Sequence, residues 1–516
     1  MEIANIKTKE DVLRYFEQTG NTCISIEDCQ ENTLLSSMLA AGSLWTRDGY
    51  ATLPYIMKVE KEIAERVIQL RDYKGSFPAV SHEDIDRMIA EFEALQTEQK
   101  GFKFKLADQQ AEAVHGALTN QVFILTGGPG TGKTCVLDCM NSILRKIKPD
   151  AEIIFTAPTG KAARRITESV GEPASTIQKK MHLTDETAQP LPIYGDCIIV
   201  DEISMLDTLT ADAFFMAVRL GVKVILVGDV DQLPSVGYGS VLKDLIESSE
   251  LAITKLLAPQ RQDASSVLFQ NITNLKNGMA ELFQGDDFKI VHADDKTGLD
   301  TLITEYFRSV DKWGIDNVCC LTPYRRKGPS CANVMNDIIQ KRINDPDKTP
   351  HLTTTITEDD DELSKCSSRR ITFCLGDPVI QLVNRNEIAN GDVGKIIEVD
   401  QNSITVKYEG DIIVEYRKSE LDQLNLAYAM SVHKSQGSEY KCVVTSALPE
   451  HKRLLCRNML YTAVTRAKKD CVVVCDQATV EEGLKRQAGY ERETLLSSFI
   501  WHEGRKGKLL AKLKIA

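Results

Sequence analysis

The chain has 516 residues, which predicts three or four domains, since an ordinary domain takes about 150 residues. A hydrophobic share of 42% and a charged share of 26% are typical of a soluble globular protein, and no run approaches the ~20 apolar residues of a membrane span. The amino terminus has no apolar stretch behind a basic head, so it is not a signal peptide and a cytoplasmic protein is expected. The net charge of −12 argues only weakly against nucleic-acid binding, because the local field of a groove decides that property.

Fourteen cysteines raise the question of disulfides or a zinc site. Cys135 and Cys139 lie four residues apart in a predicted helix, and Cys471 and Cys475 bound an apolar run. No paired C-x₂-C units occur, which disfavours zinc. We expect buried free thiols in a reducing compartment.

Residues 1–98 form a predicted N-terminal accessory domain that is charged and mostly helical. Residues 58–70 place apolar side chains at helical spacing, and a short strand is expected near residues 50–53. From residue 99 to 254, apolar strands alternate with helices, which indicates a parallel sheet in an α/β domain. The predicted strands are Val122–Leu125, Ile153–Thr156, Cys197–Val200 and Lys223–Val227.

A second α/β domain is predicted over residues 255–344 and 426–500. Its expected strands are Val318–Thr322, Cys442–Ser446 and Asp470–Cys475. Between them, residues 345–425 contain short alternating strands with Asn390–Gly391 and Glu409–Gly410 at turns, which indicates a small β-barrel-like insertion. Residues 501–516 form a basic tail, for which a solvated helix end is the simplest interpretation and a DNA or protein contact the alternative.

The strongest chemical signal is GGPGTGKT, which follows an apolar strand and precedes a helix. Glycines at this position let backbone N–H groups surround phosphate oxygens at the positive end of the helix. The motif predicts that Lys133 reaches the β- and γ-phosphates and that the Thr134 hydroxyl is a ligand of Mg²⁺. The expected nucleotide contacts are Gly127, Gly128, Pro129, Gly130, Thr131, Gly132, Lys133 and Thr134.

Two further strands end in polar residues. Asp201 and Glu202 follow a buried strand, at the edge where ligands bind in open α/β sheets. We expect Asp201 to hold Mg²⁺ and Glu202 to orient and deprotonate the attacking water, since an unpaired buried carboxylate is otherwise costly. Gln232 follows another strand and is expected to contact the γ-phosphate, although a structural turn explains this short motif almost as well.

The order of these motifs resembles that of superfamily 1 helicases, and within them of the RecD-like branch. The resemblance extends over roughly residues 104–475. LADQQAEAV resembles the glutamine motif, which implies that Gln110 reads the adenine edge. TAPTGKAARR and ASTIQKKM resemble motifs Ia and Ib, although Gln178 stands where the family more often has histidine. YAMSVHKSQGSEY and YTAVTRAKK resemble motifs V and VI.

The resemblance implies an α/β fold of two RecA-like lobes with ATP in the cleft between them. It also implies a small SH3-like β-barrel in the second lobe and a mostly helical N-terminal domain. Arg261 and Arg466 match the arginines of motifs IV and VI, where Gln260 replaces the usual aromatic neighbour. They are expected to stabilise transition-state charge, an effect of roughly 10³–10⁵ in rate in comparable phosphoryl transfer.

DNA contacts are implied by the same resemblance. Pro158, Thr159, His433, Lys434 and Ser435 are placed at strand ends, where they would hold phosphates without reading sequence. Residues 183–195 lie where relatives carry a hairpin that splits the duplex, and this segment is short here. The RecD-like details imply movement 5′ to 3′ on single-stranded DNA.

The implied partners are single-stranded DNA and DNA forks, with a single-strand-binding protein or a repair, recombination or replication complex as protein partner. A monomer at the nucleoid, using ATP and Mg²⁺, is expected, with no membrane contact. An RNA helicase of the same superfamily remains open, because motor motifs contact the backbone similarly in both nucleic acids. A nucleotide-switched DNA-binding or loading ATPase that does not separate strands is the other alternative.

Overall fold

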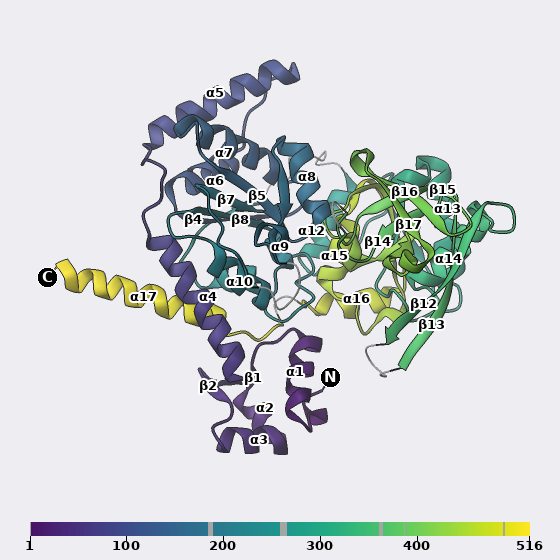
Figure 1. Cartoon of the computed structure of the whole chain (residues 1–516), viewed down its shortest axis with the longest axis horizontal. Coiled ribbons are helices and arrows are strands. Elements are labelled where there is room, and N and C mark those ends of the chain that lie inside the picture. Colours follow the sequence, from purple (N-terminus) through teal and green to yellow (C-terminus); the bar gives the residue numbers. More distant parts are fainter. Residues whose placement is uncertain are drawn as a thin grey trace. The chain divides into compact units, whose positions relative to one another are not determined.

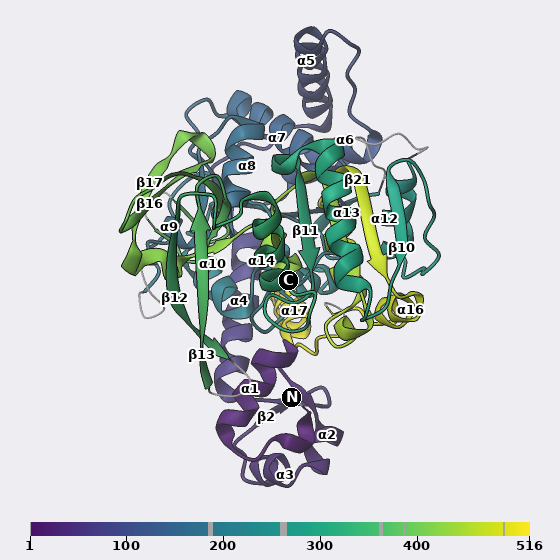
Figure 2. The same cartoon turned by 90° about the vertical axis from the view of Figure 1, so that its right-hand side faces the viewer.

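A computed structural model of the chain describes residues 2–183, 189–257, 266–360, 365–385, 388–488 and 491–515, apart from the side chains of residues 357–360, 365–367 and 507–515. The chain forms two compact units. Unit 1 comprises Met1–Pro158, Ala162–Gln262 and Gln487–Ala516, and unit 2 comprises Thr159–Lys161 and Asp263–Arg486. Figures 1 and 2 show their elements from two directions. No helix among the described residues is both long and apolar enough to cross a membrane.

The sheet of unit 1 has six parallel strands in the order β6-β5-β7-β8-β4-β9. The bounds are β4 Val122–Gly127, β5 Ile153–Ala157, β6 Ala174–Thr176, β7 Cys197–Val200, β8 Lys223–Gly228 and β9 Ala252–Leu256. Val122 and Ile124 pack into one hydrophobic cluster, whereas Phe123 and Leu125 pack into another. Such a strand is buried on both faces and needs a continuous apolar run. The four strands predicted in this region are therefore confirmed to within two residues at their ends.

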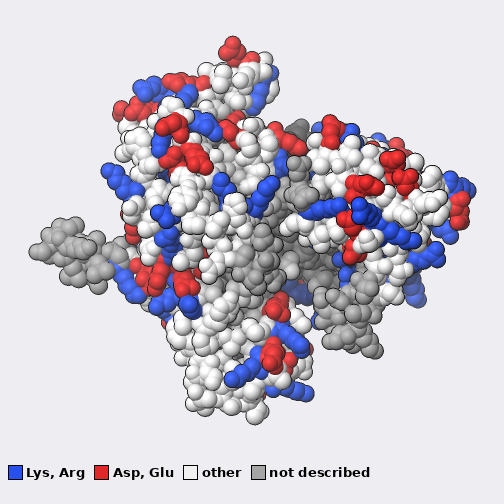
Figure 3. Space-filling view, in the orientation of Figure 1, with Lys and Arg blue, Asp and Glu red and all other residues white. Residues whose placement is uncertain are grey.

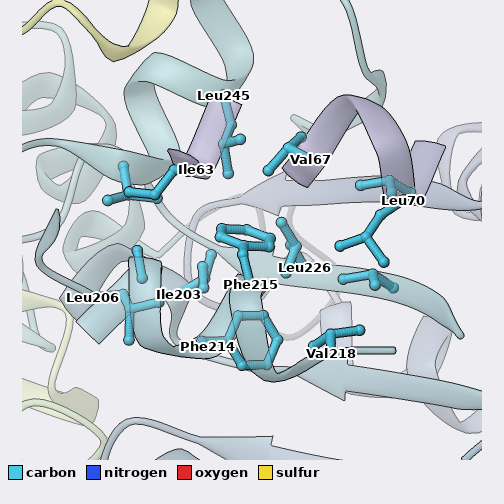
Figure 4. Packing of buried hydrophobic residues seen from close by; sticks show 14 of the residues in the cluster. Ile63, Val67, Leu70, Ile203, Leu206, Phe214, Phe215, Val218, Leu226 and Leu245 are labelled. Atoms are coloured by element: carbon cyan, nitrogen blue, oxygen red, sulfur yellow. The ribbon is translucent and has the colours of Figure 1, made fainter. Parts of the chain in front are cut away.

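Helices cover both faces of this sheet. Against one face lie α4 Pro54–Asp72, α10 Thr208–Ala217, α11 Val241–Glu247 and α17 Leu496–Ile515; against the other lie α5 His82–Lys100, α6 Asp108–Thr119, α7 Lys133–Ile147 and α8 Gly160–Val170. Figure 4 shows the first face, where Ile63 and Val67 of α4 and Phe214 and Phe215 of α10 surround Leu226 of β8. A parallel sheet covered on both faces is the coarse fold that the sequence predicts.

The C-terminal segment differs from the predicted boundary. We expected residues 426–500 in the second domain, but the chain returns to unit 1 at Gln487. The reason is an apolar stripe at helical spacing: Leu496, Phe499 and Ile500 of α17 join the cluster that α4 buries. Figure 1 shows α17 lying beside α4, so these two helices, far apart in the sequence, pack together on one face of the unit 1 sheet.

The first residues of unit 1 form a small core of their own, which we call the N-terminal subdomain (residues 3–56). Its elements are α1 Lys9–Thr19, β1 Ile24–Ser25, α2 Ile26–Glu31, α3 Thr33–Ala40, β2 Trp45–Arg47 and β3 Tyr50–Thr52. The strands form an antiparallel sheet in the order β1-β3-β2. Helix α1 begins with a capping box, in which Thr8 and Asp11 each accept a hydrogen bond from the other's backbone N–H.

Unit 2 contains a second parallel sheet, in the order β10-β21-β20-β11-β19. Its strands are β10 Phe288–His292, β11 Val318–Thr322, β19 Ala429–Ser431, β20 Tyr440–Ala447 and β21 Ala467–Cys475. Its helices are α12 Val267–Lys276, α13 Gly298–Trp313, α14 Ala332–Ile343, α15 Arg457–Val464 and α16 Gln477–Lys485. The three strands predicted here are confirmed, and the described cysteines are buried except Cys135, which is half-buried.

An antiparallel insertion lies between β11 and β19 in the sequence. It comprises the hairpin of β12 His351–Asp360 and β13 Lys365–Cys374, then β14 Pro378–Gln381, β15 Val393–Val399, β16 Ser403–Tyr408, β17 Ile413–Arg417 and β18 Leu424–Leu426. The last five strands form one sheet in the order β17-β16-β15-β14-β18. Its buried residues, Tyr408 and Tyr416 among them, share one hydrophobic cluster with the unit 2 sheet.

Candidate nucleotide site

The glycine-rich loop joins β4 to α7 at the carboxyl edge of the unit 1 sheet. Gly130 and Gly132 have φ values of 74° and 86°, in the left-handed region that glycine adopts without strain. The Thr131 hydroxyl donates to the carbonyl oxygen of Gly128 at 2.8 Å, which closes the loop on itself. Helix α7 begins directly after Gly132, so its free N–H groups and positive end lie at the loop, an arrangement that binds anions.

Lys133 extends over this loop. Its ammonium Nζ donates to the carbonyl oxygens of Gly127 and Gly128, at 2.5 Å and 3.2 Å. Thr134 is the next residue of α7 and is half-buried. A cation held over a glycine-rich loop at a helix N-terminus is arranged to bind phosphate oxygens.

Asp201 and Glu202 follow β7 at the same edge of the sheet. The Asp201 N–H donates to the carbonyl oxygen of Thr156 at 2.9 Å, and the Asp201 carboxylate accepts from the Glu202 N–H at 2.8 Å. Glu202 has a φ of 53°, a strained value for a residue with a side chain, and such strain clusters at functional sites. Burial and the charge of Glu202 raise the pKa of Asp201 to about 6, while Lys133 opposes this rise. Cation and carboxylates therefore lie within electrostatic range of one another.

Gln232 lies on the loop after β8, which runs between β4 and β7 in the sheet. Its side-chain Nε2 donates to the Asp229 carboxylate at 3.4 Å, and the Asp231 N–H donates to the same carboxylate at 3.1 Å. Both Asp229 and Gln232 are buried. The three strand ends thus bring Lys133, Asp201 and Gln232 to one edge of unit 1, where the sequence places them.

Gln110 lies in the first turn of α6 and is buried. Its side-chain Oε1 accepts from the Ala107 N–H at 3.0 Å, and its Nε2 donates to the Thr131 carbonyl oxygen at 3.0 Å. The side chain therefore ties α6 to the glycine-rich loop. Adenine recognition by Gln110 stays a prediction.

The five residues expected to contact DNA occupy two loops. Pro158 and Thr159 lie between β5 and the first turn of α8, and His433, Lys434 and Ser435 form a 3-10 turn after β19. The Lys434 ammonium donates to the Asn390 side-chain oxygen at 2.8 Å, and burial lowers its pKa.

Ser435 differs from the other four because it is fully buried. Its hydroxyl donates to the Val432 carbonyl oxygen at 2.7 Å, within the turn. On the face shown in Figure 3, lysines and arginines are interspersed with aspartates and glutamates.

Arg466 lies in unit 2, two residues after α15, and is 3% exposed. Its guanidinium donates to the carbonyl oxygens of Thr462 and Ser438, at 3.2 Å and 3.3 Å. Gln260 and Arg261 lie outside the described residues, as do residues 184–188 of the expected strand-splitting segment.

Arg492 is a residue that the motifs do not single out. From the C-terminal segment, it donates hydrogen bonds to the loop that follows Gln232. No sequence signal could have found it, because it lies more than 250 positions from that loop and outside every motif.

Comparisons with known proteins agree with the motif order. The profile described as "AAA domain" matches residues 110–238, and "UvrD-like helicase C-terminal domain" matches residues 426–474. The "ATP-dependent RecD2 DNA helicase" of Deinococcus radiodurans is 29% identical over 474 residues, which cover 90% of this chain and 61% of that protein. The chain is thus similar to RecD-like helicases of superfamily 1.

A second relative covers a smaller part of the chain. "RecBCD enzyme subunit RecD" of Mycolicibacterium smegmatis is 27% identical over 427 residues, covering 74% of this chain and 73% of that protein. The chain spans about three-fifths of the length of the Deinococcus protein. One solved structure, on DNA unwinding at forked double-stranded DNA by two coordinating Pif1 helicases, has 19% identity and a TM-score of 0.48, covering 73% of this chain and 94% of that one. That similarity is too low to establish the fold, which rests on the sheets themselves.

Proposed function

We propose that this chain is an ATP-driven DNA helicase that moves 5′ to 3′ on single-stranded DNA. The observation that carries the proposal is the carboxyl edge of the unit 1 sheet, where the glycine-rich loop, Lys133, Asp201 and Glu202 come together. A protein that only binds nucleotide has no need of Glu202 beside Asp201. Its similarity to the RecD2 DNA helicase and to RecD supports the same activity.

The residues present fit a nucleotide with Mg²⁺. The Asp201 carboxyl has a raised pKa, caused by burial and by Glu202, and a nearby cation would relieve that cost. Thr134 and Asp201 would hold the metal, which when bound supplies charge neutralisation on the phosphates. Lys133 binds the β- and γ-phosphates, and Gln110 contacts the adenine.

For hydrolysis, Glu202 orients a water and takes its proton as the water oxygen attacks the γ-phosphorus. The bond to the bridging oxygen breaks, and ADP and phosphate form. Gln232 contacts the γ-phosphate and reports its loss. Arg466 and Arg261 stabilise the charge that develops on the transferred group.

For the DNA side, we propose that Pro158, Thr159, His433 and Lys434 hold phosphates of a single strand. Ser435 would act through the turn that its hydroxyl closes and not through a direct phosphate contact. We assign residues 99–254 to a first RecA-like lobe, residues 255–344 and 426–486 to a second, and residues 345–425 to an SH3-like domain. The cellular setting that fits is the nucleoid, with DNA forks and a repair or replication complex as partners.

ATP hydrolysis measured with single-stranded DNA, single-stranded RNA and no nucleic acid tests the proposal. We expect strong stimulation by DNA and little by RNA, with the Glu202→Gln variant as the inactive control. Equal or greater stimulation by RNA would establish the RNA helicase instead. Hydrolysis that neither nucleic acid stimulates would favour a nucleotide-gated switch.

A further inference from the structure

The loop that carries Gln232 is held from two sides. We call residues 229–240, between β8 and α11, the sensor loop. Gln232 lies near its start, and Ser235, Gly237, Tyr238 and Gly239 form the part that leads to α11. These two parts are separated by only two residues, so the position of Ser235 restricts the positions that Gln232 can take.

The first anchor is the N-terminal subdomain. Tyr238 is 8% exposed and packs in the hydrophobic cluster of that subdomain. Among the described buried residues of the cluster, it alone comes from outside residues 3–56; the others are Ile6, Val12, Tyr15, Phe16, Ile24, Cys29, Leu35, Met38, Leu44, Ala51 and Ile56. The Gly239 N–H also donates to the Gly20 carbonyl oxygen at 2.8 Å. A buried tyrosine ring contributes a large apolar contact, so the subdomain fixes this end of the loop.

The second anchor is Arg492, in the segment before α17. Its guanidinium Nη1 donates to the Ser235 hydroxyl at 3.0 Å and to the carbonyl oxygens of Gly237 and Gly239 at 3.0 Å and 2.6 Å. Its Nη2 donates to the Ser235 carbonyl oxygen at 2.7 Å. These four hydrogen bonds engage three alternate residues of the sensor loop.

Arg492 is half-buried, and its guanidinium donates four hydrogen bonds to this loop. Burial lowers its pKa to about 10, and the charge of Asp207 opposes the shift. A guanidinium partly withdrawn from water is costly unless its donors are satisfied, so these hydrogen bonds stabilise one arrangement of the loop carbonyls.

Two glycines make this packing possible. A Cβ on Gly20 would lie 2.1 Å from Arg492 Nε, and a Cβ on Gly239 would lie 1.8 Å from the Thr208 hydroxyl. Both glycines also have positive φ values, of 79° and 95°. Glycine at these two positions therefore allows the close approach of Arg492 to the N-terminal subdomain and of the sensor loop to α10.

We propose that the N-terminal subdomain and Arg492 are positioning elements of the ATPase, which hold the sensor loop so that Gln232 meets the γ-phosphate. This inference rests on the proposed function for the role of Gln232. It gives the N-terminal subdomain a task in hydrolysis, apart from any contact with DNA.

Hydrogen–deuterium exchange of the sensor loop tests the inference without relying on activity. In the full chain, Arg492→Ala should speed exchange of the amides of residues 232–239 by about tenfold, because local opening becomes easier. The glycine-rich loop of residues 127–132 should exchange as in the wild type. Arg66→Ala is the matched control, since Arg66 also donates to two carbonyl oxygens in unit 1, those of Phe215 and Val218. Exchange of the sensor loop should stay unchanged in that variant.

Steady-state ATP hydrolysis separates a positioning role from a merely structural one. We expect Arg492→Ala to lower kcat by about tenfold while KM for ATP changes by less than about twofold, since a small misplacement impairs the reaction more than binding. Arg492→Lys should recover part of the loss. Tyr238→Ala should behave like Arg492→Ala, whereas Tyr238→Phe keeps the ring and should restore kcat.

Unchanged exchange of the sensor loop in Arg492→Ala would overturn the inference, whatever the wild-type activity. An unchanged kcat in a variant whose loop does exchange faster would also overturn it. If DNA did not stimulate ATP hydrolysis by the wild-type protein, the proposed function would be contradicted instead. The exchange data would still decide whether Arg492 holds the sensor loop.

Discussion

The two parallel sheets of this protein have similar architecture, but different residues follow the carboxyl ends of their strands. In both, the central strands are buried, with helices packed against the sheet. In unit 1, β4 and β7 end in a glycine-rich loop and in two adjacent acids. In unit 2, β20 is followed by Glu450 and His451, which contact Ser330 inside the unit. The strands give each unit its stability, and the residues just beyond the strands determine its chemistry.

Removing the Lys133 ammonium of unit 1 should have the largest effect on ATP turnover. Lys133→Ala should abolish ATP turnover, because no other group would bind the β- and γ-phosphates from the loop, while the fold remains. Phosphate release measures the loss. Lys148→Ala, at the other end of α7, is the control and should retain activity, since Lys148 contacts Asp196 and not the loop.

Unit 2 should contribute to ATP hydrolysis through Arg466. Arg466→Ala is expected to lower kcat by about 10³-fold with little change in nucleotide binding, the behaviour of a transition-state contact. Because the guanidinium also donates to two carbonyl oxygens, Arg466→Lys and a thermal unfolding curve check that the unit still folds. Arg261→Ala should act in the same way. If either substitution only raised KM, that arginine would bind the ground state.

The role of Glu202 as general base in unit 1 can be tested by substitution. Glu202→Gln should bind ATP with Mg²⁺ normally and hydrolyse it at least ~10²-fold more slowly, the scale of a lost general base. Binding of a fluorescent ATP analogue and single-turnover hydrolysis separate the two steps. Glu247→Gln, at an exposed position of α11, should leave hydrolysis unaffected. Near-normal hydrolysis by Glu202→Gln would show that another group is the base.

A smaller effect should appear in the pH dependence of the stability of unit 1. Glu60 of α4 is fully buried, its carboxylate accepts from the Thr22 hydroxyl at 2.7 Å, and burial raises its pKa to about 8. The folded state therefore binds this proton more tightly than the unfolded state, where the usual value is about 4.3. Protonated Glu60 therefore contributes fully to the free energy of unfolding below pH ~4, and this contribution is lost as the pH rises towards 8.

Glu60→Gln removes that ionisation and keeps the shape. The thermal midpoint of the wild type should fall between pH 6 and pH 8 by a few degrees more than that of the variant. Equal shifts in the two proteins would mean that Glu60 is already ionised in the folded state.

The sequence predicted the sheets well because buried parallel strands leave a continuous apolar run, as in Ile198–Val200 and Val443–Val444. It also placed Lys133 and Asp201 at one edge, since the carboxyl ends of parallel strands meet there. Both inferences use only local pattern and the rule that parallel strands share a direction.

Contacts between distant segments were not predictable in this way. Nothing local in Arg492 indicates that it donates to Gly237 and Gly239, and nothing in Tyr238 indicates a place in the N-terminal core. The return of α17 to unit 1 was missed for the same reason, because its apolar stripe would suit either unit. Amphipathic pattern specifies that a face is buried and leaves open what covers it.

Unwinding of duplexes that carry a single-stranded tail at one end tests the central claim most directly. With ATP and Mg²⁺, a duplex with a 5′ tail should open, and one with a 3′ tail should open little or not at all. The Lys133→Ala variant should open neither. Preferential opening of the 3′-tailed duplex would contradict the assigned direction of movement, and opening of neither by an active ATPase would contradict the helicase itself.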